Sequence, residues 1–82
     1  MGEFYAKKAE EFYNDNDPFE ALKYADMALK SDPKNVDALS VKGAVFFDRK
    51  DYNQALMLFK QASEIDPNNE GIQEWIEYIE SQ

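Results

Sequence analysis

Cysteine and histidine are absent from this chain of 82 residues. Without them the chain can form no disulfide, no zinc finger, no imidazole metal site and no nucleophile of the Cys or Ser-His kind. Carboxylates are the most abundant titratable groups, but no pair of them stands out by its spacing as an acid–base catalyst. We therefore expect no enzymatic activity, no bound metal and no cofactor.

Positive charge is also scarce, because nine Lys and Arg are outnumbered by 17 Asp and Glu and the net charge is −8. Nucleic acids and anionic membranes both attract clustered cations, so we expect neither as a direct partner. The longest apolar stretch, residues 43–47, is far shorter than the roughly 18 residues that span a membrane. The N-terminus also lacks the pattern of a signal peptide, and we expect a soluble, cytoplasmic protein.

The sequence does contain an internal repeat with an offset of 34 residues. When residues 2–35 are aligned with 36–69, nine positions are identical, including Ala21 with Ala55 and Pro33 with Pro67. A fixed period of this length is typical of repeat proteins, in which stacked units bury a shared core. We therefore divide this single domain into a first repeat at 2–35, a second at 36–69 and a capping helix at 70–82.

Each repeat has the apolar spacing of two helices separated by a polar break. Asp17 and Asp51 precede helix starts as acidic caps, while Asn35 and Asn69 can cap the helices that follow two Asp-Pro turns. No strand is needed anywhere. We expect an all-α fold of antiparallel helix-turn-helix repeats, with helices at 3–14, 18–31, 36–49, 52–65 and 70–81.

The last helix has one apolar stripe, formed by Ile72, Trp75, Ile76 and Ile79, and Glu side chains elsewhere. We expect this stripe to cover the second repeat, with Trp75 as its anchor. No equivalent segment covers the other end of the stack. Phe4 and Tyr5 are therefore expected either to be partly exposed or to meet a second chain.

The residues that recur in each unit have a characteristic placement. The second repeat has Leu39, Gly43 and Phe46 on its first helix, Tyr52 at the turn, Ala55, Phe59 and Ala62 on its second helix and Pro67 at its end. The first repeat has Tyr5, Ala9, Phe12, Ala21, Ala25, Ala28 and Pro33 at the matching places. A unit of 34 residues with this pattern resembles the tetratricopeptide repeat.

The resemblance predicts how the helices pack. Small residues at Ala9 and Gly43 would let the paired helices approach closely. The chain departs from the family pattern where Ala25 replaces a large side chain and where Lys8 and Lys42 replace a usual leucine. We expect the stems of these lysines to lie along apolar surface with their ammonium groups in water. Two repeats are fewer than the three usually needed for stability, which is consistent with dimerisation or with a longer array.

The resemblance also implies a function, which is that of a non-catalytic scaffold for protein–protein interaction. Members of the family typically bind a peptide or protein along a concave groove lined by the first helix of each pair. The ligand-facing places of the family fall on Glu10, Tyr13, Asn14, Asp37, Ser40, Ala44, Phe47, Asp48, Glu74 and Tyr78, with Glu3 and Ala6 beside them.

Helical spacing independently supports three of these positions. If Phe12, Phe46 and Ile79 point into the stack, each of the neighbours Tyr13, Phe47 and Tyr78 points about 100° away from it. We expect these aromatics and the acidic residues around them to form an acidic groove with an apolar floor, suited to a segment with basic and apolar side chains.

Other interpretations remain open. The same aromatics can belong to the core or to a dimer contact. In the second case the chain is a self-associating structural module, a homodimer for which exchange of a helix is one route. One subset of the family binds the acidic tails of chaperones through basic side chains, but the corresponding places near Ala6, Glu10, Ser40 and 71–75 are not basic here. The oxygen-bearing residues between Asp66 and Glu77 have the spacing of a calcium loop, but a capped helix explains them better.

Overall fold

The computed structural model describes residues 2–82, and in these residues five α-helices are joined by short turns, without any strand. The helices are α1 (Gly2–Asn14), α2 (Pro18–Ser31), α3 (Val36–Asp48), α4 (Tyr52–Ile65) and α5 (Glu70–Glu80). The predicted all-α fold is confirmed. Every helix begins and ends within one residue of its expected position.

Side-chain caps define where four of the helices begin. Each cap accepts a hydrogen bond from the backbone N–H three residues further on, at distances of 3.0–3.3 Å, and the capping residues are Asp17, Asn35, Asp51 and Asn69. All four are the residues expected to cap. A cap of this kind typically contributes about 1 kcal/mol, because it satisfies a backbone donor that the first turn of a helix leaves unpaired.

The turns inside the two helix pairs have the same backbone conformation. Asn16 has a φ of 62° and Lys50 a φ of 64°, and these two residues lie at equivalent positions 34 residues apart. In both turns the N–H of the next residue reaches back to the helix: Asp17 donates to the carbonyl of Phe12 at 2.8 Å, and Asp51 donates to that of Phe46 at 2.9 Å. This is the Schellman arrangement, which closes a helix with a left-handed residue.

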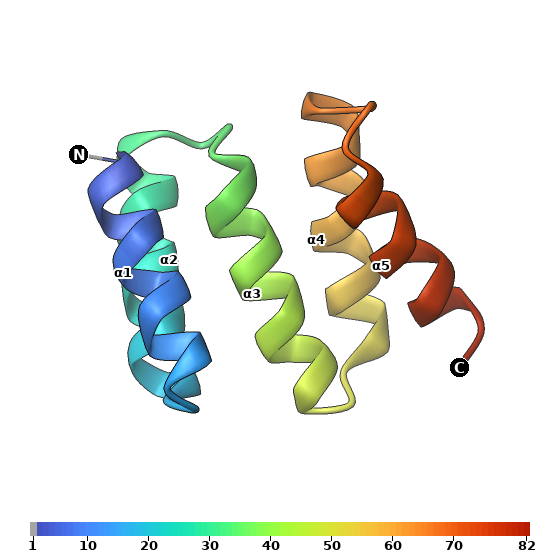
Figure 1. Ribbon diagram of the computed structural model, residues 1–82, viewed down its shortest axis with the longest axis horizontal. Coiled ribbons are helices and arrows are strands. Elements are labelled where there is room, and N and C mark those ends of the chain that lie inside the picture. Colours follow the sequence, from blue (N-terminus) through green and yellow to red (C-terminus); the bar gives the residue numbers. More distant parts are fainter. Residues whose placement is uncertain (1) are drawn as a thin grey trace.

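Figure 1 shows α1 and α2 at one end of the molecule, α3 in the middle and α4 and α5 at the other end, so the two termini lie at opposite ends. Helix α1 packs on α2 and α3 packs on α4, forming a first and a second helix pair. The pairs meet where α3 contacts both α1 and α2, and α5 packs on α4. The core therefore has two centres, one around the first pair and α3 and the other around the second pair and α5.

Small residues set the spacing within each pair, as expected. In the first pair the helices meet through alanines, of which Ala9 and Ala25 have no exposed surface. In the second pair Gly43 faces the fully buried ring of Phe59, and a Cβ at Gly43 would lie 2.7 Å from Phe59 Cε2. Phe59 in turn stacks on Trp75 of α5, with ring centroids 4.9 Å apart, so the tryptophan joins the capping helix to the second pair.

Lys42 joins the two pairs electrostatically. Its side chain is half-buried on α3, and its ammonium nitrogen lies 2.8 Å from Oδ1 of Asp26 on α2. The equivalent Lys8 is more exposed and pairs with Glu11 of its own helix at 3.7 Å. The course of the lysine stems along apolar surface stays a prediction, and the ammonium group of Lys42 has a carboxylate partner.

Candidate functional site

Three helices contribute to one face of the stack. Figure 1 shows α1 in front of α2 and α5 in front of α4, with α3 between them. The sequence-predicted binding residues lie on these three helices, and we call them the inner face: Glu10, Tyr13 and Asn14 of α1, Asp37, Ser40, Ala44, Phe47 and Asp48 of α3, and Glu74 and Tyr78 of α5.

A hydrogen bond links α1 to α3 on the inner face. The phenol of Tyr13 donates to Oδ2 of Asp48 at 3.0 Å. Burial raises the pKa of Tyr13 to about 12, and the hydrogen bond to Asp48 and the charge of its carboxylate act in the same direction. Because the folded-state pKa lies above the ordinary 10.0, the contribution of this group to stability is present below pH 10 and is lost as the pH rises towards 12.

The other end of α1 and α3 carries an acidic cluster. A shallow hollow of about 280 Å³ is lined by Glu3, Lys7, Glu10 and Asp37. Burial raises the pKa of Glu10 above its ordinary value, the nearby charge of Asp37 raises it further, and Lys7 opposes the shift. Three carboxylates thus share one cation at this place, which favours the approach of additional positive charge.

Aromatic side chains join α3 to α5. Phe47 contacts Tyr52, Trp75 and Tyr78, with ring centroids 5.3–5.4 Å apart. Beside them an open hollow of about 560 Å³ is lined by Gly71, Glu74, Trp75 and Tyr78. Tyr78 is 56% exposed, so this end of the inner face offers aromatic surface next to a carboxylate.

The predicted binding residues are not equally accessible. Asn14, Asp37, Asp48 and Glu74 are exposed and Ser40 is half-buried. Ala44 is only 5% exposed and offers almost no side-chain surface. Within residues 2–82 no ring contact joins Tyr13 to Phe47, so the aromatics form two groups rather than one floor.

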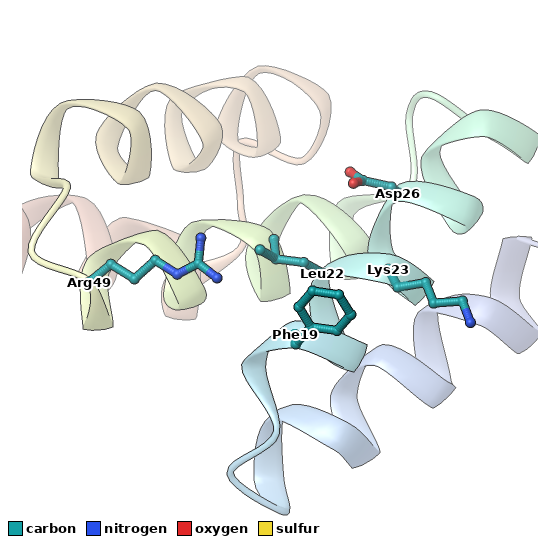
Figure 2. Close-up of a pocket in the computed structure, with 5 residues that line it drawn as sticks. All are labelled: Phe19, Leu22, Lys23, Asp26 and Arg49. Atoms are coloured by element: carbon teal, nitrogen blue, oxygen red, sulfur yellow. The ribbon is translucent and has the colours of Figure 1, made fainter.

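The structure also contains a surface that the sequence analysis missed. A hollow of about 390 Å³ is lined by Phe19, Leu22, Lys23, Asp26 and Arg49, which we call the outer pocket. Figure 2 shows Phe19 and Leu22 near its centre, with Arg49 and Lys23 extending on opposite sides. One signal was available, since Phe19 stands where the second repeat has Asn53, but only the fold brings α2 next to Arg49.

Neither a cluster suited to a metal ion nor a helix suited to a membrane occurs in residues 2–82. No group of three or more His, Cys, Asp or Glu side chains in residues 2–82 is arranged to hold a metal ion. In the segment with calcium-like spacing, Asp66 instead accepts a hydrogen bond from the side chain of Asn69 at 3.2 Å. Among the helices of residues 2–82, none combines the length and apolar character needed to cross a membrane.

Comparison with known proteins identifies the second helix pair. Residues 38–69, which run from α3 through α4 to the turn before α5, match the family model described as tetratricopeptide repeat. No curated protein matches the chain. Repeats of this family typically serve as non-catalytic modules of protein–protein interaction, which implies that the chain has protein partners. The match therefore supports a tetratricopeptide repeat over residues 38–69.

Proposed function

We propose that the chain binds a peptide segment of a protein partner along the inner face, and that this segment carries basic and apolar side chains. The observation that best supports the proposal is the division of the inner face into an acidic half on α1 and α3 and an aromatic half on α3 and α5. A bound segment that follows the row of helices meets the two halves in turn.

The negative charge of the acidic half favours a basic segment as the ligand. Burial and the neighbouring Asp37 make the ionised form of Glu10 less favourable than it is in water. A lysine or arginine of the ligand placed between these two carboxylates relieves their repulsion. Such complementarity raises the association rate and excludes acidic competitors more than it adds affinity.

Aromatic surface supports apolar side chains at the other end of the segment. The hollow beside Trp75 and Tyr78 has a volume of about 560 Å³, which is ample for one bulky apolar side chain. Tyrosine and tryptophan are also the residues that most often carry the binding energy of an interface. An extended peptide can place every second side chain on such a surface, and a helical peptide can place one side chain from each turn on it.

Replacing Tyr78 by alanine tests the aromatic half. Because this side chain is 56% exposed, its truncation removes contact surface without opening the core. Phe47 is a poorer choice, since it packs on three other aromatic rings. We expect Tyr78→Ala to weaken binding of a fluorescein-labelled peptide with alternating Lys and Leu by about tenfold, measured by fluorescence anisotropy.

Charge reversal on the acidic half provides the second measurement. Glu10→Lys should weaken the same peptide, whereas the matched control Glu64→Lys makes the same charge change on an exposed position of α4 and should have little effect. Equal losses in the two variants would contradict the proposal, because the peptide would then respond only to the net charge of −8.

Self-association is a second candidate, and it is favoured by the aromatic side chains at the free side of the first pair. Phe4 is 57% exposed there and contacts Tyr5, which in turn packs beside Tyr24. The equivalents of the two tyrosines in the second pair, Leu39 and Leu58, are buried. Light scattering over a range of concentrations distinguishes the candidates, and a dimer that buries Tyr13 and Phe47 would contradict peptide binding at the inner face.

A further inference from the structure

The outer pocket lies on the side of α2 that faces away from the core. The buried alanines of α2, Ala21, Ala25 and Ala28, form the stripe that packs into the stack. Leu22 and Lys23 lie three and four residues after Phe19, and Asp26 lies four and three residues after them, so the four side chains form a stripe on a different side of the same helix. None of the inner-face residues lines this pocket.

Phe19 gives the outer pocket an apolar centre. Its side chain is 74% exposed, the largest exposed fraction among the large hydrophobic side chains of residues 2–82. Leu22 lies beside it and is half-buried. Figure 2 shows the two side chains next to each other with charged side chains around them, and apolar surface with a polar rim is typical of an interaction site.

Two cations in the outer pocket have no anionic partner. Within residues 2–82, neither Lys23 nor Arg49 has a carboxylate oxygen within 4.0 Å, although the chain as a whole carries a net charge of −8. Their nearest interactions are with rings: the nitrogen of Lys23 is 5.6 Å from the ring centre of Tyr24, and the guanidinium of Arg49 is 5.9 Å from that of Phe46. These contacts leave the N–H donors of both cations available.

The one anion of the pocket is already paired. Asp26 lies 2.8 Å from the ammonium of Lys42, which reaches it from α3. This ion pair largely cancels the negative charge of Asp26 at the pocket. In Figure 2 its carboxylate lies apart from Phe19, whereas Arg49 extends towards Leu22. The local charge of the outer pocket is therefore positive.

We propose that the outer pocket docks an acidic peptide segment of a protein partner, with one bulky apolar side chain on Phe19 and Leu22 and carboxylates on Arg49 and Lys23. The guanidinium of Arg49 can bind a carboxylate through two parallel hydrogen bonds, and Lys23 supplies a second, less directional charge. This site is independent of the inner face and selects the opposite charge. The chain then connects two partners, or two segments of one partner.

A labelled peptide tests the outer pocket directly. The probe is a short fluorescein-labelled peptide in which a Leu-Phe core is flanked by Glu on both sides, and anisotropy is measured at physiological salt, where charges more than about 8 Å away are screened. We expect saturable binding that Phe19→Ser and Arg49→Glu each weaken by about tenfold. Asp26→Asn should tighten binding, since it leaves the ammonium of Lys42 without its carboxylate partner and so adds positive charge beside the pocket.

Matched controls separate this site from other surfaces. Met57→Ser alters a side chain on α4 that is 53% exposed and lies outside the pocket, so it should leave binding unchanged. Circular dichroism verifies that Phe19→Ser and Arg49→Glu keep the helical fold. If either variant loses its helices, Lys23→Glu replaces it in the comparison.

Three results would overturn the proposal. Equal binding of a probe with Gln in place of Glu would show that charge does not contribute to recognition. Loss of binding in Tyr78→Ala would place the acidic probe on the inner face instead. Self-association that Phe19→Ser abolishes would assign the pocket to a second copy of the chain. Because the inner face is tested with a basic peptide and other variants, either proposal can fail without the other.

Discussion

At the scale of single residues, Gly43 is the glycine with the least room for a Cβ atom among Gly2, Gly43 and Gly71. It lies inside α3, where glycine lowers helix stability by about 1 kcal/mol relative to alanine. The space that an alanine methyl group would need is occupied by Phe59, whose ring has no exposed surface and is held by Trp75. Close packing against the ring and intrinsic helix propensity therefore act in opposite directions at this position.

We expect Gly43→Ala to destabilise the protein by about 1–2 kcal/mol, because overpacking against a fully buried ring costs about 2–3 kcal/mol, in the upper part of the usual range, and the gain in helix propensity offsets about 1 kcal/mol. Urea unfolding followed by circular dichroism measures the change. Gln61→Ala, at an exposed position of α4, should shift stability by less than about 0.5 kcal/mol. A Gly43→Ala protein as stable as the parent would mean that Phe59 can move aside.

Residue-scale features differ in how well the sequence predicts them. Asp17 and Asn35 are capping residues whose partners lie three positions away, so their roles could be predicted from local sequence. The left-handed conformation of Lys50 could not, because lysine has no preference for it and only the equivalence with Asn16 points there. The burial of Ala44 was equally hidden, since an alanine fits either a core or a groove.

At the scale of elements, α5 is stabilised by its packing against the core of the second helix pair. It has 11 residues, which is too short for a stable isolated helix in water. Ile72 and Ile79 are buried in the second core centre, Trp75 stacks on Phe59, and the side chain of Gln73 donates to Ser63 Oγ at 2.6 Å. The helix and the core beneath it are therefore mutually dependent.

We expect Trp75→Ala to destabilise the protein by about 2–3 kcal/mol, somewhat less than the truncation of a fully buried aromatic residue, because Trp75 is only half-buried. Amide hydrogen exchange should increase first in α5, whose packing against α4 is directly weakened. Glu77→Ala on the exposed side of α5 is the control. An unchanged urea midpoint would show that α5 is not needed to cover Phe59.

The two candidate surfaces show why elements are more predictable than sites. The helices could be placed within one residue because their start and stop signals are local. The outer pocket depends on Arg49, at the end of α3, lying beside Phe19 and Leu22 of α2, and no spacing within either helix encodes that proximity. The residues of the inner face were predicted mainly from the family resemblance, which specifies the helices that share a side, and helical spacing supports three of them.

At the scale of the whole molecule, charge is the main unbalanced quantity. The net charge is −8, and of the three ion pairs in residues 2–82, two have separations of 3.7 Å between exposed groups. Exposed pairs of this kind contribute at most about 1 kcal/mol each, and often nothing measurable. Repulsion among the excess carboxylates is therefore expected to dominate the response to salt.

We expect the free energy of unfolding at neutral pH to rise by about 0.5–1 kcal/mol as sodium chloride is increased from near zero to about 0.15 M. At that salt concentration the screening length falls to about 8 Å, which weakens the repulsion among the carboxylates. Differential scanning calorimetry measures it. Neutralising one exposed carboxylate, as in Glu77→Gln, should make the rise smaller. A decrease in stability with salt would mean that the ion pairs outweigh the repulsion.

Because the turns inside the two helix pairs are equivalent, further pairs can be added to the stack without changing its fold. A copy of residues 36–69 inserted after Asn69 would bring its own left-handed turn and its own asparagine cap for the helix that follows. The new joint would need editing at one place, because Lys60 stands where the first pair has Asp26, and the copied Lys42 would meet a cation instead of a carboxylate. An acidic residue in place of Lys60 would restore the pairing and allow the stack to be extended unit by unit.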